Sequence, residues 1–329
     1  MEFKRIVLTE RGGPETLKMQ TAPLVAPQEK ELQIKVLACG VGRTDVAMRY
    51  GYYPFAPKIP FVPGYEIVGE ITAIGQGVST FAVGDRVAAL TVYGGYAEYI
   101  FLAEEEVVPV PATLHSEEAV ALILNYITAY QMLHRELQVQ PGATVLVTGA
   151  SGGVGSALLD LGKLAGLKIY GTASASKHAT VEAQGVIPLD YRSEDWVEQL
   201  KSMEPNGLDY VIDGVGGAYI PLGFSLLKQG GRMVGYGFPN FWGMLKGLLQ
   251  LQGLSLLPNG RKGSFYGISA NYRQDKSTIH ADLRTLFQLL EAGKIKPLIA
   301  KRYGLLEAAA ANRYLESGQV QGKIVLVAG

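Results

Sequence analysis

The sequence predicts an α/β protein in which a doubly wound parallel sheet is joined to a β-rich, barrel-like domain. Residues 1 to about 120 read as many short strands punctuated by Gly and Pro, a pattern typical of barrel-like domains. From about Ser116 onward, helical patterns alternate with short apolar strands, the order that builds a parallel sheet with helices on both faces. We therefore expect the β-rich domain at residues 1–124 and 264–329 and the parallel-sheet domain at residues 125–263.

Composition and charge place the chain among ordinary globular proteins. Of 329 residues, 48% are hydrophobic and 18% are charged, and this length allows two domains with large cores. The formal net charge is zero, which argues against nucleic acid as a partner. Cys39 is the one cysteine, so no intrachain disulfide can form. The first residues show no signal peptide, and we expect a cytoplasmic protein.

The β-rich domain is predicted from alternating and β-branched runs. The alternation of apolar and polar residues is clearest at 32–36, as in a half-buried strand. Four prolines mark a loop between about 50 and 64. The strands expected in this part of the chain are 1–8, 32–36, 66–75 and 85–89.

The parallel sheet is predicted from five apolar runs, at 145–148, 168–172, 185–189, 208–212 and 231–236. The tail contains an expected helix at 282–292 and an expected strand at 322–327. It shows no sixth strand–helix unit of the same kind. We therefore expect the tail to return to the β-rich domain.

The stretch from Val145 to Gly155 predicts a binding site for a dinucleotide. An apolar strand ends in a turn of A-x-G-x-x-G form, and helical spacing begins at Val154. Gly152 would let the backbone approach a pyrophosphate, and Gly155 would let the helix lie close to the strand. The helix N-terminus offers N–H groups and a positive dipole end to phosphates. We assign Ser151, Gly152, Gly153, Val154 and Gly155 to the cofactor site.

The end of the second parallel strand favours NADPH over NADH. An NAD site usually carries Asp or Glu there to bind the ribose 2′-hydroxyl, but residues 172–178 contain no carboxylate. Ser174 and Lys177 offer a hydroxyl and a cation that suit a 2′-phosphate. The alternative for both residues is an ordinary polar loop.

The stretch 241–257 is unusually apolar. It is short for a membrane span, and Lys246, Gln250 and Gln252 interrupt it. One interpretation is a helix and loop that cover the protein's own cleft or a subunit contact. The other is a helix that lies on a membrane surface.

Several motifs together resemble one enzyme superfamily over nearly the whole length. They are Gly64–Glu66, Val83–Val87, Gly94–Tyr99 and the glycine turn. The chain is identified as a member of the medium-chain dehydrogenase/reductase superfamily, and it resembles the zinc-free quinone oxidoreductase (zeta-crystallin-like) branch. Residues 125–130 and 171–178 are most similar to the vesicle amine transport protein homologue subgroup. The resemblance implies a GroES-like domain and a Rossmann domain.

The resemblance also bears on the metal. At the positions of the superfamily's catalytic zinc ligands stand Gly42 and Tyr65, and only Glu66 remains. One carboxylate cannot hold a catalytic zinc. The four histidines show no ligand pair at short spacing, and the four-cysteine lobe is missing. We expect no metal, and hence no Lewis acid for alcohol oxidation.

The roles of further residues are implied by the resemblance. Tyr53 would lie near nicotinamide and substrate, with Tyr52 as the alternative, and both could instead be loop-packing aromatics. Thr128 would steer the nicotinamide amide, and Tyr191 would contact the 2′-phosphate. The other cofactor contacts expected are Tyr236, at the end of the fifth strand, and Phe265 and Gly267, in a late loop.

These observations predict an NADPH-dependent, zinc-independent reductase that transfers hydride to a quinone or an α,β-unsaturated carbonyl. The alternative is a nucleotide-binding protein with weak or no activity that acts at a membrane or with a protein partner. We expect a homodimer, because an open parallel sheet leaves an edge strand. The resemblance implies that the segment after Tyr236 supplies that edge.

Overall fold

The chain divides into two compact units. Unit 1 comprises Met1–Ile127 and Ser269–Gly329, and unit 2 comprises Thr128–Ile268. The computed structural model describes residues 1–237 and 241–329. The units therefore divide the chain after Ile127 and after Ile268, whereas the predicted second boundary, at 263/264, falls inside a strand.

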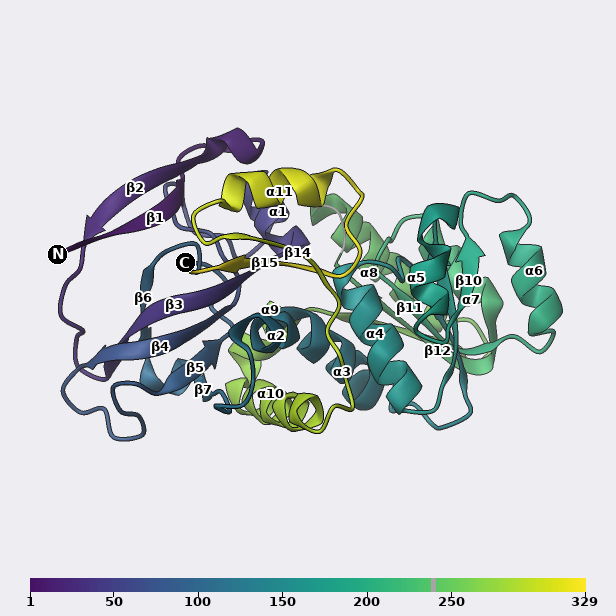
Figure 1. The fold of residues 1–329 in the computed structure, drawn as a ribbon. Coiled ribbons are helices and arrows are strands. Elements are labelled where there is room, and N and C mark those ends of the chain that lie inside the picture. Colours follow the sequence, from purple (N-terminus) through teal and green to yellow (C-terminus); the bar gives the residue numbers. More distant parts are fainter. Residues whose placement is uncertain (238–240) are drawn as a thin grey trace. The chain divides into compact units, whose positions relative to one another are not determined.

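Unit 1 is built on a seven-stranded sheet and a separate two-stranded hairpin. The path of the sheet is β14-β15-β3-β4-β5-β7, and β6 also pairs with β3. The strands are β1 (Glu2–Leu8), β2 (Leu17–Pro23), β3 (Glu31–Val41), β4 (Ile67–Ile74), β5 (Arg86–Ala89), β6 (Tyr99–Ala103), β7 (Val108–Pro109), β14 (Ile299–Gly304) and β15 (Lys323–Val327). Strand β15 pairs antiparallel with β3, so the chain's tail completes the N-terminal sheet as predicted (Figure 1).

The helices of unit 1 are short, apart from α10. They are α1 (Arg43–Arg49), α2 (Ser116–Ala121), α9 (Ile268–Gln274), α10 (Lys276–Glu291) and α11 (Ala308–Glu316), with short helical turns η1 (Pro14–Thr16), η2 (Glu104–Glu106) and η3 (Leu122–Tyr126). Helix α9 begins in unit 2 with Ile268. Helix α10 begins six residues before its predicted start, because the Asp275 side chain accepts hydrogen bonds from the N–H groups of Ser277 and Thr278.

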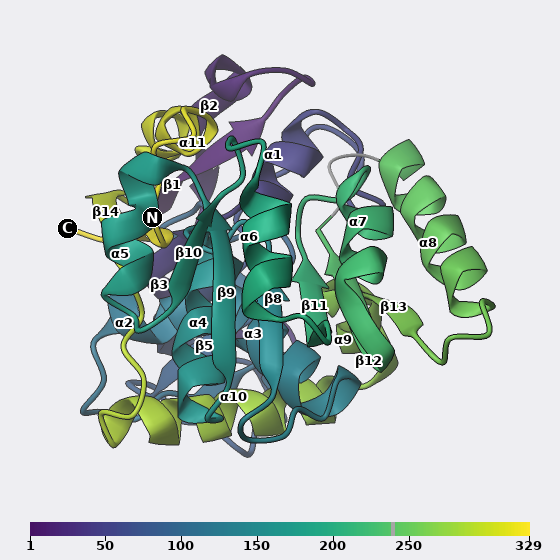
Figure 2. The same cartoon turned by 90° about the vertical axis from the view of Figure 1, so that its right-hand side faces the viewer.

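Unit 2 is a parallel sheet of six strands in the order β10-β9-β8-β11-β12-β13 (Figure 2). The strands are β8 (Thr144–Val147), β9 (Lys168–Ala173), β10 (Ile187–Asp190), β11 (Leu208–Asp213), β12 (Leu227–Tyr236) and β13 (Lys262–Tyr266). Successive strands extend in one direction from β8 and in the other from β11. Since parallel crossovers are right-handed, the helices after β8 and β9 cover the opposite face from the helix after β11. This is a doubly wound Rossmann sheet.

The helices of unit 2 are α3 (Ile127–Gln131, whose first residue belongs to unit 1), α4 (Gly153–Leu164), α5 (His178–Glu182), α6 (Trp196–Met203), α7 (Tyr219–Leu226) and α8 (Phe241–Ser255), with turns η4 (Met132–Glu136) and η5 (Ala175–Lys177). Side chains of α6, α7 and α8 form one buried cluster with the sheet, which includes Trp196, Phe224 and Leu251. With the β-rich unit 1 and the Rossmann sheet of unit 2, the predicted α/β fold class is confirmed.

Strand β13 is a sixth parallel strand, at the start of the tail in which we expected no further strand–helix unit. Its sequence, Lys-Gly-Ser-Phe-Tyr, contains no aliphatic run, so the strand pattern is absent from the residues. It forms because its backbone pairs in parallel with β12, from Arg232↔Lys262 to Tyr236↔Tyr266. Strand β12 is thus an inner strand, and β10 and β13 are the edges. Residues 238–240 of the segment predicted to supply the dimer edge lie outside the described residues.

The apolar stretch 241–257 forms α8 and the turn after it. Several of its apolar side chains are exposed, among them Trp242 (74%), Leu249 (61%) and Leu256 (86%). Across the described residues, every helix is too short or too polar to cross a membrane.

Candidate functional site

The glycine turn of unit 2 follows β8 and leads into α4. Gly149 has a left-handed backbone (φ +66°), a conformation that favours glycine. Its N–H donates to Thr172 Oγ1 at 3.1 Å, and the Ala150 N–H donates to the Thr172 carbonyl oxygen at 3.0 Å. The turn is therefore tied to β9. The N–H groups of the first turn of α4, at Gly153, Val154 and Gly155, have no partner within the helix.

Gly155 allows the close packing of α4 on the turn. A Cβ at this position would lie 2.3 Å from the Gly149 carbonyl oxygen and 2.6 Å from that of Ala150. No side chain can replace this hydrogen without moving the helix. At Gly152 a Cβ would lie 3.3 Å from the Gly149 carbonyl oxygen, a tight contact. Ser151, which precedes Gly152, is buried.

Thr128 carries a polar atom that lacks a partner. Its side chain is 4% exposed, and its buried Oγ1 has no hydrogen-bond partner among the described residues. A buried hydroxyl without a partner costs free energy. An amide group of a bound ligand would satisfy it.

The ends of β9 and β10 bring together polar and cationic groups. Ser174 is buried, and its Oγ lies 3.3 Å from Ser176 Oγ. Burial, followed by the nearby Arg192 guanidinium, lowers the pKa of the Lys177 ammonium. The Arg192 guanidinium also lies 5.6 Å from the ring centroid of Tyr191, which is 42% exposed. Ser174, Lys177, Tyr191 and Arg192 thus form a cationic surface that fits a phosphate.

The remaining predicted cofactor residues lie on the last strands of unit 2. The Tyr236 ring covers Gly214, where a Cβ would lie 2.7 Å from the phenol oxygen. Burial, followed by the charge of Asp213, raises the pKa of Tyr236. Phe265 lies within β13 and packs against the buried cluster, so its predicted place in a loop is wrong, for the reason given for β13. Gly267 follows the strand.

In unit 1, three hydroxyl groups meet around Tyr53. Tyr53 OH lies 2.6 Å from Tyr65 OH and 2.6 Å from Ser269 Oγ, and Tyr65 OH is also hydrogen-bonded to Ser269 Oγ. Tyr65 and Ser269 are buried, whereas Tyr53 is half-buried. Each hydroxyl can both donate and accept a hydrogen bond. The group that contacts a ligand can therefore donate to it while accepting a hydrogen bond from a neighbouring hydroxyl.

Burial raises the pKa of the Tyr53 phenol, although hydrogen bonds from Ser269 and Tyr65 oppose this. Burial raises the pKa of Tyr65 still more strongly. Both phenols are therefore protonated donors at neutral pH. The Tyr52 ring instead stacks on Tyr50, with centroids 6.0 Å apart. The hydroxyl cluster thus includes Tyr53 and not Tyr52.

The residues at the superfamily's zinc positions do not fit a catalytic zinc. Gly42 has no side chain, and Tyr65 is engaged in the hydroxyl cluster. Glu66 forms a buried ion pair with Lys323 and accepts a hydrogen bond from the Leu124 N–H. Within residues 1–237 and 241–329, no group of three His, Cys, Asp or Glu side chains could hold a metal ion.

Asp45 organises the backbone beside this cluster. Its carboxylate accepts hydrogen bonds from the N–H groups of Gly42 (2.8 Å) and Gly64 (3.1 Å), so it joins the start of α1 to the residue before Tyr65. Burial raises the pKa of Asp45 to about 6, and these N–H groups oppose the shift. Asp45 thus caps the start of α1 and also holds the backbone next to Tyr65.

Three residues of these sites were missed by the sequence analysis: Ser269, Lys323 and Arg192. Ser269 and Lys323 are 204 and 257 residues from their partners along the chain, and no local pattern joins them. Arg192 follows Tyr191 directly. A cation beside an aromatic residue at the end of the third strand is a signal that could have been used.

Comparisons with known proteins agree with this geometry. A profile of the alcohol dehydrogenase GroES-like domain matches residues 28–112, and a zinc-binding dehydrogenase profile matches residues 181–326. A synaptic vesicle membrane protein VAT-1 homolog of Rattus norvegicus is 35% identical over 340 residues, which cover 98% of this chain and 84% of that protein. A quinone oxidoreductase of the same organism is 32% identical over 331 residues, which cover 99% of this chain and 98% of that protein.

Solved structures show the same relationship. The crystal structure of a human VAT-1 homolog-like protein superposes with a TM-score of 0.87 at 29% identity, covering 99% of this chain and 98% of that one. The structure of a mycobacterial protein complexed with NADPH superposes with a TM-score of 0.86 at 28% identity, covering 99% of this chain and 99% of that one. The chain therefore belongs to the medium-chain dehydrogenase/reductase superfamily, alongside the quinone oxidoreductases and VAT-1 homologues, and is an oxidoreductase with a nicotinamide cofactor.

Proposed function

We propose that this chain is an NADPH-dependent, zinc-independent reductase of quinones or α,β-unsaturated carbonyl compounds. The observation that carries the proposal is the hydroxyl cluster of Tyr53, Tyr65 and Ser269, which includes a zinc-ligand position. With Glu66 neutralised by Lys323, a metal has no ligand set there. Reduction of a conjugated carbonyl needs less electrophilic help than oxidation of an alcohol, because the charge spreads over the acceptor.

The residues of unit 2 fit the cofactor. The backbone of residues 151–155 would hold the pyrophosphate. Ser174, Lys177, Tyr191 and Arg192 would hold the 2′-phosphate, since charge-assisted bonds from cations are the strong ones. The unpartnered hydroxyl of Thr128 would bond the nicotinamide amide. The bound cofactor supplies the hydride.

The chain's own part in the chemistry falls to Tyr53. Its phenol would donate a hydrogen bond to the acceptor's carbonyl oxygen, where negative charge develops as hydride arrives. The raised pKa of Tyr53 keeps this proton in place until then. Tyr65 and Ser269 hold the phenol's orientation through two hydrogen bonds. They are positioning residues, and Tyr53 is the proposed catalytic residue.

A panel of quinones and enones with NADPH tests the proposal. We expect turnover that a zinc chelator leaves unchanged, and a loss of kcat of about 10²-fold in Tyr53→Phe. Tyr52→Phe is the matched control, because its ring stacks on Tyr50 outside the cluster, and its kcat should stay within about twofold. Inhibition by the chelator, or equal kcat in both variants, would overturn the mechanism.

One observation favours the alternative function at a membrane. Helix α8 exposes apolar side chains, and residues 214–274 contain no Asp or Glu but six Lys and Arg residues. Apolar and basic surfaces together favour anionic bilayers. Flotation with vesicles rich in phosphatidylserine tests this, and Leu249→Gln should reduce it. Tight NADPH binding without turnover on the whole panel would support this alternative.

We also propose a homodimer formed through an edge of the parallel sheet. Strand β13 is an edge of the parallel sheet, and unpaired edges are usually covered. Light scattering at micromolar concentration should give twice the chain mass of 35.4 kDa. A monomer at that concentration would contradict the proposal.

A further inference from the structure

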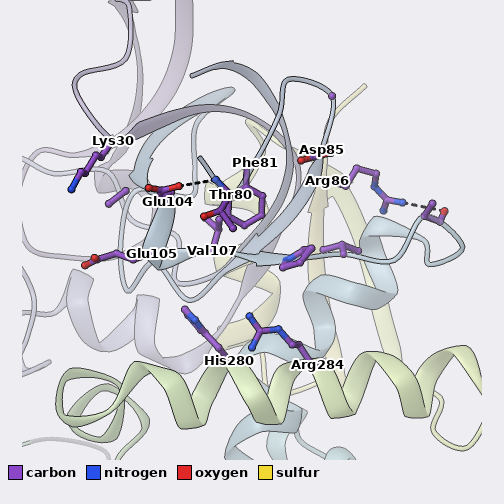
Figure 3. A pocket seen from close by; sticks show the side chains of 15 residues that line it. Lys30, Thr80, Phe81, Asp85, Arg86, Glu104, Glu105, Val107, His280 and Arg284 are labelled. Atoms are coloured by element: carbon purple, nitrogen blue, oxygen red, sulfur yellow. Dashed lines mark hydrogen bonds between the residues drawn. The ribbon is translucent and has the colours of Figure 1, made fainter. Parts of the chain in front are cut away.

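A groove of about 900 Å³ lies within unit 1, apart from every residue assigned above to the reaction. Its floor is α10, and its walls are the turn before β5, the start of β5, η2 and β7 (Figure 3). His280 and Arg284, one helical turn apart, project from α10 toward Val107 (Figure 3). Its volume is in the range of small-molecule sites.

The acidic side chains of the groove are already satisfied. Glu104 accepts hydrogen bonds from the N–H groups of Ser79 and Thr80, each at 3.2 Å. Asp85 accepts from the Ala82 N–H at 2.8 Å. Glu105 forms an ion pair with Lys276 at 3.3 Å. These carboxylates have little need of a further cation.

The two arginine side chains of the groove have no charged partner within the described part of the chain. Arg284 is exposed, and among the described residues its guanidinium makes no hydrogen bond or ion pair, although it has five N–H donors. Arg86 gives its donors to neutral groups, the Leu114 carbonyl oxygen at 2.9 Å and Ser116 Oγ at 3.0 Å, and so keeps its charge uncompensated. The Arg284 charge is close enough to His280 to lower the pKa of that imidazole, second only to burial.

The groove is also lined by three apolar side chains. Phe81, Val107 and Val110 line the groove. Phe81 is half-buried, whereas Val107 and Val110 are buried. The exposed part of the Phe81 ring gains free energy when a flat apolar group covers it. A ligand that fits both parts has one anionic end and one apolar body.

We propose that this groove binds an aromatic carboxylate, with its carboxylate on Arg284 and His280 and its ring against Phe81 and Val107. Arg binds carboxylates through two parallel N–H bonds. A neutral quinone or enone lacks this anionic end. The groove is therefore a second ligand site, and its occupancy does not depend on the reaction proposed above.

Binding of 2-naphthoate to the full chain tests the proposal, with the neutral 2-naphthamide as the matched probe. We expect one saturable site for 2-naphthoate, weakened at least about tenfold in Arg284→Gln and weakened also in His280→Gln. Arg313→Gln is the control, since Arg313 is an exposed arginine on α11, and it should bind as the parent does. Amide shifts in NMR spectra should cluster at residues 80–86, 104–110 and 280–284.

The proposal would be overturned by no saturable binding, by equal affinity for 2-naphthamide, or by equal weakening in Arg313→Gln. Shifts confined to residues 174–192 would also overturn it, because the probe would then occupy the cationic surface of unit 2. Unchanged thermal unfolding of Arg284→Gln excludes misfolding as the cause of a loss. Lys177→Ala, which lies in unit 2, should leave 2-naphthoate binding intact.

Discussion

The buried ion pair of unit 1 sets the largest stability change that we expect from one substitution. The side chains of Lys323 and Glu66 are 3% and 0% exposed. Lys323→Met keeps the apolar stem but leaves the Glu66 carboxylate with a single donor, the Leu124 N–H. Removing one partner of a buried pair costs about 3–5 kcal/mol. We expect Lys323→Met to lower the free energy of unfolding of unit 1 by that amount.

The loss of stability in Lys323→Met should grow as the pH rises. Burial already raises the pKa of Glu66, and Lys323 opposes this shift. Without the ammonium, the pKa of Glu66 in the folded variant rises further above its value in the unfolded chain, about 4.3. The folded variant then binds a proton that the unfolded chain releases, so its stability falls as pH rises through this window. The destabilisation should be larger at pH 8 than at pH 5.

Native-state hydrogen exchange is the suitable assay. Both tryptophans, Trp196 and Trp242, lie in unit 2, so their fluorescence does not report unit 1. Peptides from β3 and β4 give the opening free energy directly. Lys294→Met, at an exposed lysine of the same unit, should change it by less than about 0.5 kcal/mol. A cost below about 1 kcal/mol for Lys323→Met, or a cost that grows on acidification, would refute the reasoning.

The double variant Glu66→Leu/Lys323→Met separates the lone charge from lost packing. With both charges removed, only the Leu124 N–H remains without a partner, which costs about 1–3 kcal/mol. We therefore expect the double variant to be more stable than Lys323→Met alone. A double variant less stable than the single one would show that the carboxylate is not the source of the cost.

Three further predictions concern unit 2. Gly155→Ala should abolish NADPH binding and destabilise the unit by about 1–3 kcal/mol, because its Cβ would lie 2.3 Å from a carbonyl oxygen; the control Gly253→Ala, with nothing within 4 Å, should be neutral or stabilising in thermal unfolding. Thr128→Val should weaken NADPH binding by about 0.5–1.5 kcal/mol in a fluorescence titration without lowering stability, since its hydroxyl has no partner in the chain. Arg192→Gln and Lys177→Ala should each weaken NADPH by about 1–3 kcal/mol and leave NADH unchanged, and an equal loss for both cofactors would contradict the assigned phosphate site.

Those elements of the fold that have a local sequence pattern could be predicted from the sequence. Five of the six parallel strands are apolar runs, and they were predicted within a few residues. Strand β10 begins at Ile187 rather than at Gly185, because Gly185 has a left-handed backbone (φ +76°). Strand β13 was not predicted because its sequence contains no aliphatic run, and it forms by pairing with β12. A strand defined by its neighbour leaves no periodic pattern in its own residues.

For the candidate sites, the motif residues were predictable and their partners were not. The glycine turn is a contiguous pattern, so its members could be named in advance. The cluster around Tyr53 joins Tyr65 to a serine 204 residues away, and only the return of the tail to unit 1 makes that contact. The resemblance predicted that zinc ligands are missing, but it did not predict the partners that Tyr65 and Glu66 have in the structure.

Glu66, the one residue that matches the superfamily's zinc ligands, has a structural partner in Lys323. An unpartnered carboxylate at Glu66 would be costly in a fully buried place. It persists because β15, at the far end of the chain, brings the Lys323 ammonium to it. The same pairing removes the negative charge that would attract a cation, and Tyr65 turns the adjacent position into a hydrogen-bond donor. Two adjacent residues thus have different partners: Tyr65 is bonded within the hydroxyl cluster, and Glu66 is one half of a buried ion pair.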